Sequence, residues 1–576
     1  MTTRTNLRKD WPVIRQLTVL TTVFLALLAI PVAGAGAPGG ASQMVVAAHP
    51  LAAEAGREIL RRGGSAIDAA VAVQLVLNVV EPQESGIGGG GFLFHRDGAT
   101  GELTFYDGRE TAPGAATPDR FLLPLGVRLP VYVAVVSGRS IGVPGLVALL
   151  HDAHAERGRL PWESLFARAI ELAEVGVPMP GRLRRQVADD RSLWVFRSTR
   201  RYFARPAREA APVIRNPELA AVLREIAAGG PDAFYRGPRA ANLVEAARGR
   251  WLLPSDLDMD DLAAYTPLRR SPVCGRYRTW TLCGAPPPSS GGPAILQILG
   301  MLEHFDLGAL EAGSAQAVHL VAEASRLAFA DRQRYLGDPD HVDIPLEGLL
   351  DRAYLAERAA LIDPRRAMTA SPPGIPGVTP MIDDPPPVEE EEEFGTTHFS
   401  IVDAAGNAVA LTSSIEAPFG ARLMVDGYLL NNQLTDFDFR PTRGAEPAAN
   451  AVAPGKRPRS SMSPTFVFDA DGELVLVIGS RGGSRIIGYV LKTLIGVLDW
   501  GLTVEEAVRL PNVLHRGQTL ELEAGTALEH LAPELARRGH TVNVRRLESG
   551  VHAIQYRDGG WWGVADPRME GAALGD

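Results

Sequence analysis

The chain has 576 residues, of which 46% are hydrophobic and 22% are charged, and these ordinary globular proportions allow a large buried core. Its formal net charge is −9, and it becomes more negative if the basic N-terminal segment is removed. An acidic chain without a basic stripe is a poor partner for nucleic acid, so the composition excludes a nucleic-acid-binding protein.

The first 37 residues are typical of an export signal. A basic start that includes Arg4 and Arg8 precedes an apolar run from Leu17 to Val32, and a cleavage site of small residues follows at residues 33–35. The run is shorter than the ~20 apolar residues of a typical membrane-spanning helix, and an uncleaved membrane anchor is the alternative. We therefore expect a protein that is secreted or exported to the periplasm.

Two helices are predicted directly after this signal. Residues 49–62 are rich in alanine, and the glycine pair that follows is expected to end the first helix. Ser65 can cap a second helix that extends to Val79. The glycine-rich run Gly86–Gly91 comes next, and we interpret it as close packing between helix and strand rather than as a dinucleotide site.

The chain then passes from two predicted strands to a long helical region. The strand-like runs are residues 92–95 and 103–106, and they surround a Gly/Asp turn. From Val143 to about Ala360 the chain is mostly amphipathic helix. The one β-like interruption expected there is a cysteine-containing segment together with the turn at Pro286–Gly292.

Two cysteines, Cys274 and Cys283, lie in the segment SPVCGRYRTWTLCG. If this segment is a hairpin that turns near residues 277–279, the two side chains can face each other across it. Disulfides persist in exported proteins, which favours a bridge, and two separate buried thiols are the alternative. Further metal ligands are missing nearby in the sequence, so we expect no metal site.

The clearest boundary lies between Met368 and Gly395. Residues 369–395 are rich in proline and carry five consecutive glutamates, so we predict an exposed linker. From Thr396 the sequence changes to alternating strands, TTHFSIVD and NAVALTSSI, joined by a turn. Further on, TFVFD and ELVLVIGS are expected to pair, and a helix over residues 485–498 follows.

Seven short motifs occur in a fixed order along the chain. GIGGGGF, DGRETAP and PPPSSGG precede the linker, whereas TTHFS, NNQLTDF, KRPRSSMSPT and GSRGGSRI follow it. Together they resemble the motifs of the γ-glutamyltranspeptidase family, and the resemblance extends from about Met44 to the end. It implies an α/β fold, the four-layer αββα sandwich of N-terminal-nucleophile hydrolases, made as one precursor that cuts itself into two subunits that remain together.

The resemblance puts the cut between Gly395 and Thr396, which gives a large subunit of residues 38–395 and a small catalytic subunit of residues 396–576. The Thr396 hydroxyl would attack the Gly395 carbonyl in an N→O acyl shift, and water would resolve the ester. The α-amine that is released has a pKa of ~7.7–8.0 in unperturbed peptides and can act as the base for the same hydroxyl. An ordinary strand threonine is the alternative.

Ser414 and the pair Gly482-Gly483 are further candidates for catalysis. The resemblance places Ser414 where family members have a second threonine that hydrogen-bonds the nucleophile, and serine keeps that hydroxyl. Gly482 and Gly483 precede the helix that begins near Arg485, where backbone N–H groups can stabilise an oxyanion. Arg481 stands where proline is common in the family, which should alter the turn but not these donors.

A γ-glutamyl group presents an α-carboxylate and an α-ammonium, and the sequence offers partners for both. Arg109 can bind the carboxylate bidentately, and Ser460 and Ser461 could add hydroxyl donors. Asp436 and Gln433 are expected to receive the ammonium.

Glu416 is expected beside these ammonium partners. Family members can have asparagine at this position, so a carboxylate here should strengthen ammonium binding or shift the preference toward another acyl group.

The segment between Asp436 and Ser460 departs from the pattern of family members that carry a lid. Those members have a longer insert with a tyrosine gate, whereas this segment is short and contains no tyrosine. We therefore expect a more open pocket that admits larger donors or acceptors.

Three functions follow as hypotheses. The first is a γ-glutamyltransferase and glutathione hydrolase that needs no cofactor and passes the γ-glutamyl group of a glutathione-like small molecule to water or an amino acid. The second is an acylase of the same fold that cleaves cephalosporin-type or other N-acyl amides, which the short lid and Glu416 keep open. The third is a catalytically silent binding protein, which would not cleave itself.

Overall fold

The computed structural model describes residues 40–376 and 395–576 of the chain. The predicted export signal, residues 1–37, and the glutamate run of the linker lie outside the described residues. Within the part that the structure describes, none of the helices is both long and apolar enough to span a membrane.

The described strands form two large sheets of seven and six strands. In spatial order, the first sheet comprises β24 (Ala572–Gly575), β1 (Met44–Ala47), β11 (Thr397–Val402), β12 (Ala408–Ser414), β2 (Gly90–Arg96), β3 (Leu103–Gly108) and β8 (Leu268–Arg270). The second comprises β23 (Gly560–Ala565), β22 (His552–Arg557), β18 (Leu474–Gly479), β17 (Thr465–Phe468), β10 (Trp280–Gly284) and β9 (Val273–Tyr277).

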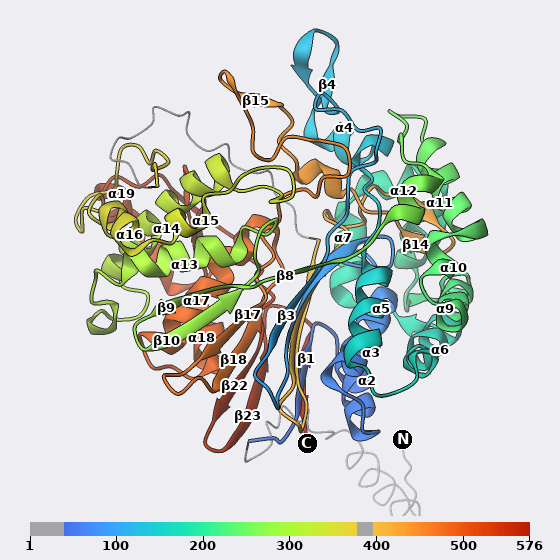
Figure 1. The fold of residues 1–576 in the computed structure, drawn as a ribbon, viewed down its shortest axis with the longest axis horizontal. Helices are drawn as coiled ribbons and strands as arrows, with labels where there is room; N and C mark the ends of the chain where they lie inside the picture. Colours follow the sequence, from blue (N-terminus) through green and yellow to red (C-terminus); the bar gives the residue numbers. More distant parts are fainter. Residues whose placement is uncertain (1–39, 377–394) are drawn as a thin grey trace, which may run out of the picture. The chain divides into compact units, whose positions relative to one another are not determined.

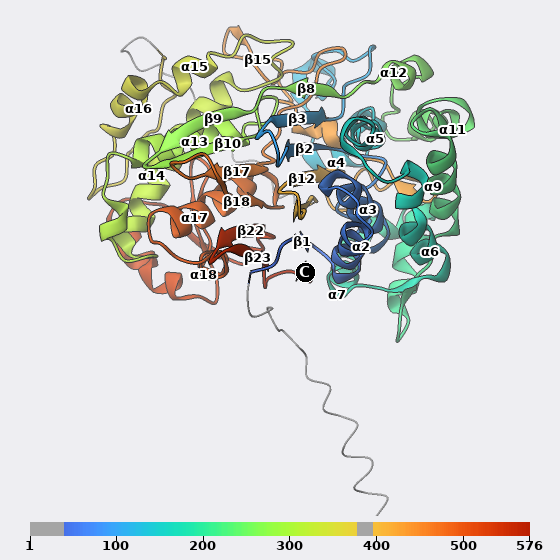
Figure 2. The same cartoon turned by 60° about the horizontal axis from the view of Figure 1, so that its bottom comes forward.

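Helices cover the outer face of each sheet, so the layers run helix, sheet, sheet, helix (Figure 1). The flank of the first sheet contains α2 (Pro50–Arg61), α3 (Ala66–Val80), α5 (Leu146–Arg157), α6 (Ala167–Val175), α9 (Pro217–Gly229), α10 (Asp232–Tyr235) and α11 (Gly237–Arg248). The flank of the second contains α13 (Gly291–Leu302), α14 (Ala315–Tyr335), α15 (Leu346–Leu349), α16 (Arg352–Ala359), α17 (Ile486–Leu498) and α18 (Val504–Arg509). Figure 2 shows α2 and α3 on one side of the sheets and α17 and α18 on the other. The predicted αββα sandwich is therefore confirmed.

Shorter elements complete the described structure. The small strand pairs are β4 (Leu122–Leu123) with β5 (Val127–Arg128), β6 (Val177–Pro178) with β7 (Val213–Ile214), β13 (Met424–Val425) with β14 (Tyr428–Leu429), and β15 (Thr442–Arg443) with β16 (Glu446–Pro447). A three-stranded sheet contains β19 (Val513–His515), β20 (Leu520–Glu523) and β21 (Val542–Arg545). The remaining helices are α4 (Val131–Val135), α7 (Gly181–Asp189), α8 (Arg197–Thr199), α12 (Met259–Ala264) and α19 (Ala532–Arg537).

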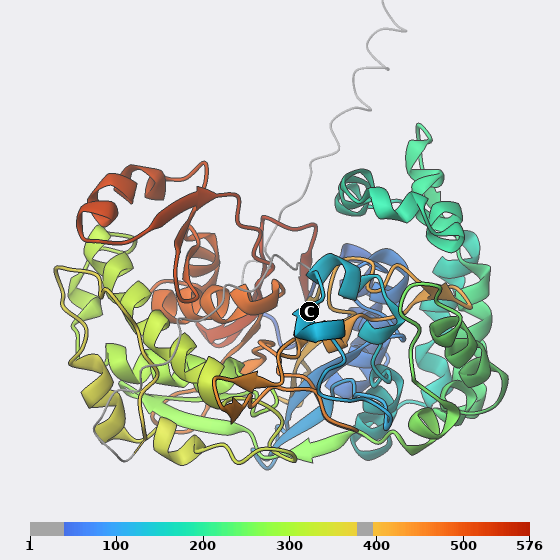
Figure 3. The ribbon, with the colours of Figure 1, turned by 90° about the horizontal axis from the view of Figure 1, so that it is seen from above.

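Segments from both sides of the linker share the same sheets. Strands β11 and β12 follow the linker, yet β11 pairs with β1 and β12 pairs with β2, which both precede it. Figure 3 shows blue-cyan and orange segments of these two parts side by side between the two helical flanks. The chain before the linker and the chain after it therefore form one hydrogen-bonded structure.

Alternation along the strands of the first sheet builds the two cores. Val45 of β1 belongs to the core beneath α2 and α3, whereas its neighbour Val46 belongs to the core between the sheets. Phe94 of β2 stacks on Phe466 of β17, with 4.2 Å between the ring centroids. Successive side chains of a strand point to opposite faces, so a strand covered on both faces is apolar throughout.

The two predicted N-terminal helices are confirmed as α2 and α3. The side chain of Ser65 accepts a hydrogen bond from the Asp68 N–H, and the Asp68 carboxylate accepts one from the Ser65 N–H. This reciprocal capping box satisfies two backbone donors that a helix start leaves without partners. It explains why the second helix begins where the serine predicts.

One expectation about the middle of the chain is wrong. The helical region contains β6, β7 and β8 in addition to the one predicted interruption, and β8 extends the first sheet. Strands of two or three residues are too short to show a periodicity in the sequence.

The start of the linker is packed rather than exposed. The Gly374 N–H donates to Asp331 Oδ1 at 2.8 Å, and Tyr335 donates to the Gly374 carbonyl at 2.6 Å. Arg358 also donates to the carbonyl of Pro372, at 2.8 Å. Side chains of α14 and α16 thus hold this stretch through its backbone, a contact that composition does not reveal.

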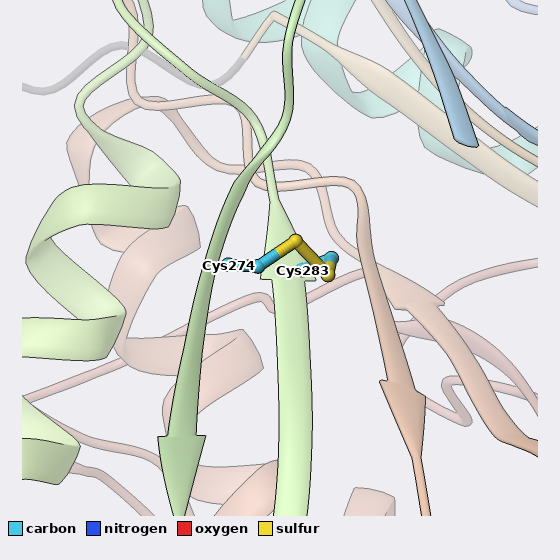
Figure 4. The surroundings of a disulfide bond; sticks show 2 residues. All are labelled: Cys274 and Cys283. Atoms are coloured by element: carbon cyan, nitrogen blue, oxygen red, sulfur yellow. A yellow bond between two sulfur atoms is a disulfide. The ribbon is translucent and has the colours of Figure 1, made fainter. Parts of the chain in front are cut away.

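The predicted cysteine hairpin is confirmed as β9 and β10. Cys274 and Cys283 lie opposite each other in the antiparallel register, and their sulfur atoms are bonded (Figure 4). Cys274 is exposed and Cys283 is buried. The bond therefore fixes the edge strand β9 to the interior of the second sheet.

Removal of this disulfide should lower stability without altering the site described below, which lies elsewhere. A loop this short predicts a loss of about 2–3 kcal/mol, so the apparent unfolding temperature of Cys274→Ser/Cys283→Ser should fall by a few degrees. Calorimetry measures the change, and reductant should shift the wild type but not the variant. An unchanged unfolding temperature in the variant contradicts this role.

Candidate active site

One cavity of about 410 Å³ brings together the residues that the sequence assigned to catalysis and binding. Nine of those ten residues line it, as does Gly395: Arg109, Thr396, Ser414, Glu416, Gln433, Asp436, Ser460, Ser461 and Gly483. The tenth, Gly482, directly precedes Gly483. The set comes from both sides of the linker, so the cavity depends on the shared sheets.

The hydroxyl groups of Thr396 and Ser414 converge on the peptide bond that precedes Thr396. The Thr396 hydroxyl contacts the Gly395 carbonyl oxygen and lies 3.2 Å from Ser414 Oγ. The Ser414 hydroxyl donates to the same carbonyl at 3.1 Å. One hydroxyl is thus next to the carbonyl carbon it could attack, while the other can stabilise the negative charge that an attack develops on the oxygen.

The register of the first sheet produces this arrangement. Thr397 begins β11 and lies opposite Ser413 near the end of β12, so Thr396 and Ser414 meet just beyond the pairing. The Glu416 N–H donates to Ser414 Oγ at 2.8 Å, which orients that hydroxyl. A β-carbon on Gly395 would collide with the backbone of Glu416 and Ala417, so only glycine fits before the threonine.

A glycine turn forms another wall of the cavity. Gly482 lies between β18 and η9 (Gly483–Arg485), and Gly483 begins η9; their φ values are 128° and 57°. Such positive φ values favour glycine. Helix α17 follows, so the turn lies at the positive end of a long helix, a suitable place for an oxyanion.

Arg109 is held by the end of the short segment between Asp436 and Ser460. Its Nε donates to the Pro458 carbonyl at 3.2 Å, and Nη2 donates to the Arg459 carbonyl at 3.0 Å. Nη2 also forms an ion pair with Asp436. The guanidinium is buried, so these contacts fix its orientation toward the cavity.

Ser461 is oriented by an arginine that the sequence analysis missed. Arg332 of α14 donates from Nη2 to Ser461 Oγ and from Nε to Ser290 Oγ, both at 2.8 Å. Because the serine oxygen already accepts from Arg332, its own proton is free to point to another acceptor. Arg332 lies in α14 outside all of the motifs quoted above, so no local pattern pointed to it.

Asp436 and Glu416 line the cavity on the side of the expected ammonium position, and Glu110 lies beside Arg109. Asp436 accepts from Gln433 Nε2 at 2.8 Å, and both residues belong to η8 (Gln433–Asp436). Burial, together with the charge of Asp436, raises the pKa of Glu416 well above its usual range, and Asn432 donates to its carboxyl group. Burial also raises the pKa of Glu110 to about 8, despite Arg109 Nη1 at 3.9 Å. The sequence analysis missed Glu110, although it follows Arg109 directly.

The short segment after Asp436 contributes to the cavity wall. Phe437, Phe439 and Arg443 line it, and the Arg128 guanidinium lies over the Phe439 ring at 4.9 Å. A more open pocket than in relatives with a lid stays a prediction. Within the described ranges, no group of three or more His, Cys, Asp or Glu side chains is arranged to hold a metal ion.

The backbone of Thr396 is bound from the other side by charged residues. Its N–H donates to Glu84 Oε2 at 3.0 Å, and its carbonyl accepts from Arg481 Nε at 3.2 Å. The sequence analysis assigned no role to Glu84, and it expected Arg481 only to alter a turn. The contact between them joins residues that are 397 positions apart, which no local pattern reveals.

Comparisons with known proteins identify the family of the chain. The family model described as gamma-glutamyltranspeptidase matches residues 52–576. The chain is 36% identical over 552 residues to the glutathione hydrolase proenzyme of Bacillus subtilis strain 168, covering 93% of this chain and 92% of the relative. It is also 36% identical over 549 residues to the acylase ACY 1 proenzyme of Pseudomonas sp. strain SE83, covering 93% and 94%. The crystal structure of cephalosporin acylase from Bacillus halodurans matches with a TM-score of 0.80 at 26% identity, covering 93% and 96%.

Ser414→Ala should slow any cleavage of the Gly395–Thr396 bond. The variant loses the hydroxyl that donates to the Gly395 carbonyl, and loss of one such donor slows comparable reactions by about 100-fold or more. Ser414→Thr keeps the hydroxyl and is the matched control. A time course on a denaturing gel measures the rate, and equal rates for Ser414→Ala and the wild type would contradict the role.

Proposed function

Because the chain belongs to the gamma-glutamyltranspeptidase family, we propose that it is a self-processing enzyme that transfers γ-glutamyl groups from glutathione-like amides to water or amino acids. The observation that carries this proposal is the contact of the Thr396 hydroxyl with the Gly395 carbonyl, with Ser414 donating to the same oxygen. The proposed products of processing are a large subunit of residues 38–395 and a small subunit of residues 396–576.

Processing begins with an attack within the chain. Thr396 Oγ adds to the Gly395 carbonyl carbon, and the Ser414 hydroxyl stabilises the resulting oxyanion. The C–N bond then breaks, and the nitrogen takes the hydroxyl proton to become a free amine. Water hydrolyses the ester, which leaves a carboxylate on Gly395 and restores the hydroxyl of Thr396. Cleavage therefore creates the base that later turnovers need.

Turnover uses the same hydroxyl on an external amide. The α-amine of Thr396 takes the proton from Oγ, which attacks the γ-carbonyl of the donor. The turn at Gly482 and Gly483 is suited to stabilise the oxyanion, and the amine of the donor leaves after it is protonated. Water or an amino acid then attacks the γ-glutamyl ester of Thr396, which releases the product and restores the enzyme.

The charges of the cavity match the two charges of a γ-glutamyl donor. The Arg109 guanidinium and the hydroxyls of Ser460 and Ser461 would bind the α-carboxylate. Asp436 and Gln433 would bind the α-ammonium, with Glu416 alongside. The ion pair of Arg109 and Asp436 has one charge of each sign, so it could bind both the α-carboxylate and the α-ammonium of one donor. The name of the Bacillus subtilis relative, a glutathione hydrolase, supports this donor class.

An acylase acting on other N-acyl amides is the second candidate. Burial raises the pKa values of Glu110 and Glu416, so these groups favour their neutral forms and need no ammonium partner. The similarity to the acylase ACY 1 proenzyme also supports an acylase activity.

The location of the enzyme is also a proposal. We propose that it is secreted or periplasmic, because residues 1–37 have the pattern of an export signal. The disulfide of the β9–β10 hairpin is compatible with an oxidising compartment.

Thr396→Ala should remain a single chain, because the variant lacks the attacking oxygen. Thr396→Ser keeps a hydroxyl and should still be processed, and a denaturing gel with mass spectrometry separates the outcomes. If Thr396→Ala is still cut between Gly395 and residue 396, another nucleophile or a protease cuts the chain. A wild type that remains uncut supports the silent binding protein.

The donor class can be tested with two anilides that differ in one group. The γ-glutamyl anilide carries the α-ammonium, whereas the glutaryl anilide lacks it. We expect kcat/KM to be about 100-fold higher for the γ-glutamyl compound, because the glutaryl compound has no ammonium group to bind Asp436. Asp436→Asn should reduce this preference. A wild type that prefers the glutaryl anilide is an acylase instead.

A further inference from the structure

A buried ionic cluster lies directly behind Thr396, outside the lining of the cavity. Its members come from four separate parts of the chain: Glu81 and Glu84 before β2, Arg182 of α7, Thr396 itself, and Arg481 after β18. The two glutamates and the two arginines are each less than 6% exposed. Charged groups are rarely buried to this degree unless they are paired, so the cluster requires an explanation.

Glu84 binds the backbone nitrogen of Thr396 and Arg481 at once. Its Oε2 accepts from the Thr396 N–H at 3.0 Å and from Arg481 Nη2 at 3.1 Å. Arg481 Nε donates to the Thr396 carbonyl at 3.2 Å, so Glu84 and Arg481 both bind the backbone of Thr396. The nitrogen of Thr396 therefore faces a carboxylate, with a guanidinium next to it.

The other oxygen of Glu84 is bound from α7. Arg182 forms an ion pair with Oε1, and Gln186 Nε2 donates to it at 3.0 Å. Burial alone would raise the pKa of Glu84, but the two guanidinium groups and these hydrogen bonds hold it below its usual value. Glu84 is therefore ionised at neutral pH and has a fixed orientation toward Thr396.

Processing changes what this carboxylate faces. In the uncut chain the nitrogen of Thr396 is an uncharged amide with one hydrogen. When the Gly395–Thr396 bond breaks, the nitrogen takes the hydroxyl proton and becomes an amine, which binds a further proton to become an ammonium group. Glu84 already lies at hydrogen-bond distance from this atom, so it needs no rearrangement to receive the new group.

We propose that Glu84 is the positioning residue that holds the new α-amine of Thr396 and that Glu84 and Arg481 together set how readily this amine takes a proton. The proposal rests on the function proposed above, in which that amine is the base. This amine must be in its neutral form to accept a proton from Oγ of Thr396. Glu84 favours the protonated form of the amine and Arg481 disfavours it, so the pair balances the two forms.

Other charged groups that face this position do not reverse the argument. Glu81 accepts from Thr397 Oγ1 at 3.0 Å, and its pKa is raised to about 7 by burial and by the charge of Glu84. Glu548 lies at the rim, 3.9 Å from Arg182 Nε. Glu84 is the carboxylate that contacts the Thr396 nitrogen. Arg481 is the cation that contacts the same oxygen of Glu84 as this nitrogen does.

The cluster also gives Arg481 a function. An uncharged residue at this position would leave the buried carboxylate of Glu84 with one fewer partner. Arg481 pairs with that carboxylate and also binds the carbonyl of Thr396. Loss of either partner leaves the other charge buried with less compensation, so the two residues are expected to depend on each other.

The pH dependence of the processed enzyme tests the proposal, because the acid limb of kcat/KM reports the base in the free enzyme. Glu84→Gln removes the charge that stabilises the ammonium, so the amine's pKa falls and the limb should move to lower pH by about one unit. Arg481→Gln removes the opposing charge, so the limb should move to higher pH. Glu84→Asp retains the charge, and its limb should stay close to that of the wild type.

Glu548→Gln is the matched control, since it removes a carboxylate from the rim of the cluster, and its limb should stay in place. Shifts of the two main variants in opposite directions support the proposal. An unmoved limb in processed Glu84→Gln, or shifts in the same direction, would overturn it. If Glu84→Gln is not processed, the Arg481→Gln variant provides the test. An acid limb of Arg481→Gln that stays in place or moves to lower pH rejects the proposal.

A second readout separates this proposal from the proposed function. The rate at which an amine-acylating reagent modifies the N-terminus of the small subunit can be followed against pH by mass spectrometry, without any substrate. Opposite shifts in this profile support the role of Glu84 even if γ-glutamyl anilide is not turned over. A wild type that is not cleaved rejects the proposed processing, and with it the amine that Glu84 would hold.

Discussion

The position of β11 within the first sheet is the constraint on which the rest of the site depends. This strand follows the linker, yet it lies between β1 and β12. Its pairing with β12 begins at Thr397, one residue after Thr396, and its pairing with β1 begins at Phe399. Both faces of β11 are covered, by helices on one side and by the second sheet on the other. A strand paired on both edges and buried on both faces cannot move, so the residue before it has a fixed position. A cut before Thr396 would leave all of these contacts in place, and the two products would remain together.

Paired charges across the two parts of the chain add a second constraint. Arg109 precedes the linker and pairs with Asp436 after it, whereas Glu84 precedes the linker and pairs with Arg481 after it. Each of these two ion pairs forms only when both parts are folded together. The cavity and the cluster behind Thr396 therefore depend on the contact between the two parts, as the shared sheets do.

Local signals in the sequence predicted the elements and the nucleophile but not the residues that support them. Ser65 predicted the start of α3 because capping is decided within a few residues, and the cysteine hairpin followed from the short spacing of the pair. Motifs located Thr396, Ser414 and Arg109 for the same reason. Glu84 and Arg332 were missed because their contacts join distant segments, and each looks like an ordinary surface charge when it is considered alone.

The same buried charges explain how one cavity can serve both a nucleophile and a zwitterionic substrate. Burial drives Glu110 and Glu416 toward their neutral forms, which leaves the ion pair of Arg109 and Asp436 as the dominant charges on that side. On the other side of Thr396, Glu84 is kept ionised by its two arginines. Because Thr396 lies between the two sets, the amine released by the proposed cleavage and the proposed donor would be bound by different carboxylates. The base could then be adjusted through Glu84 and Arg481 without a change in the residues proposed to select the acyl group.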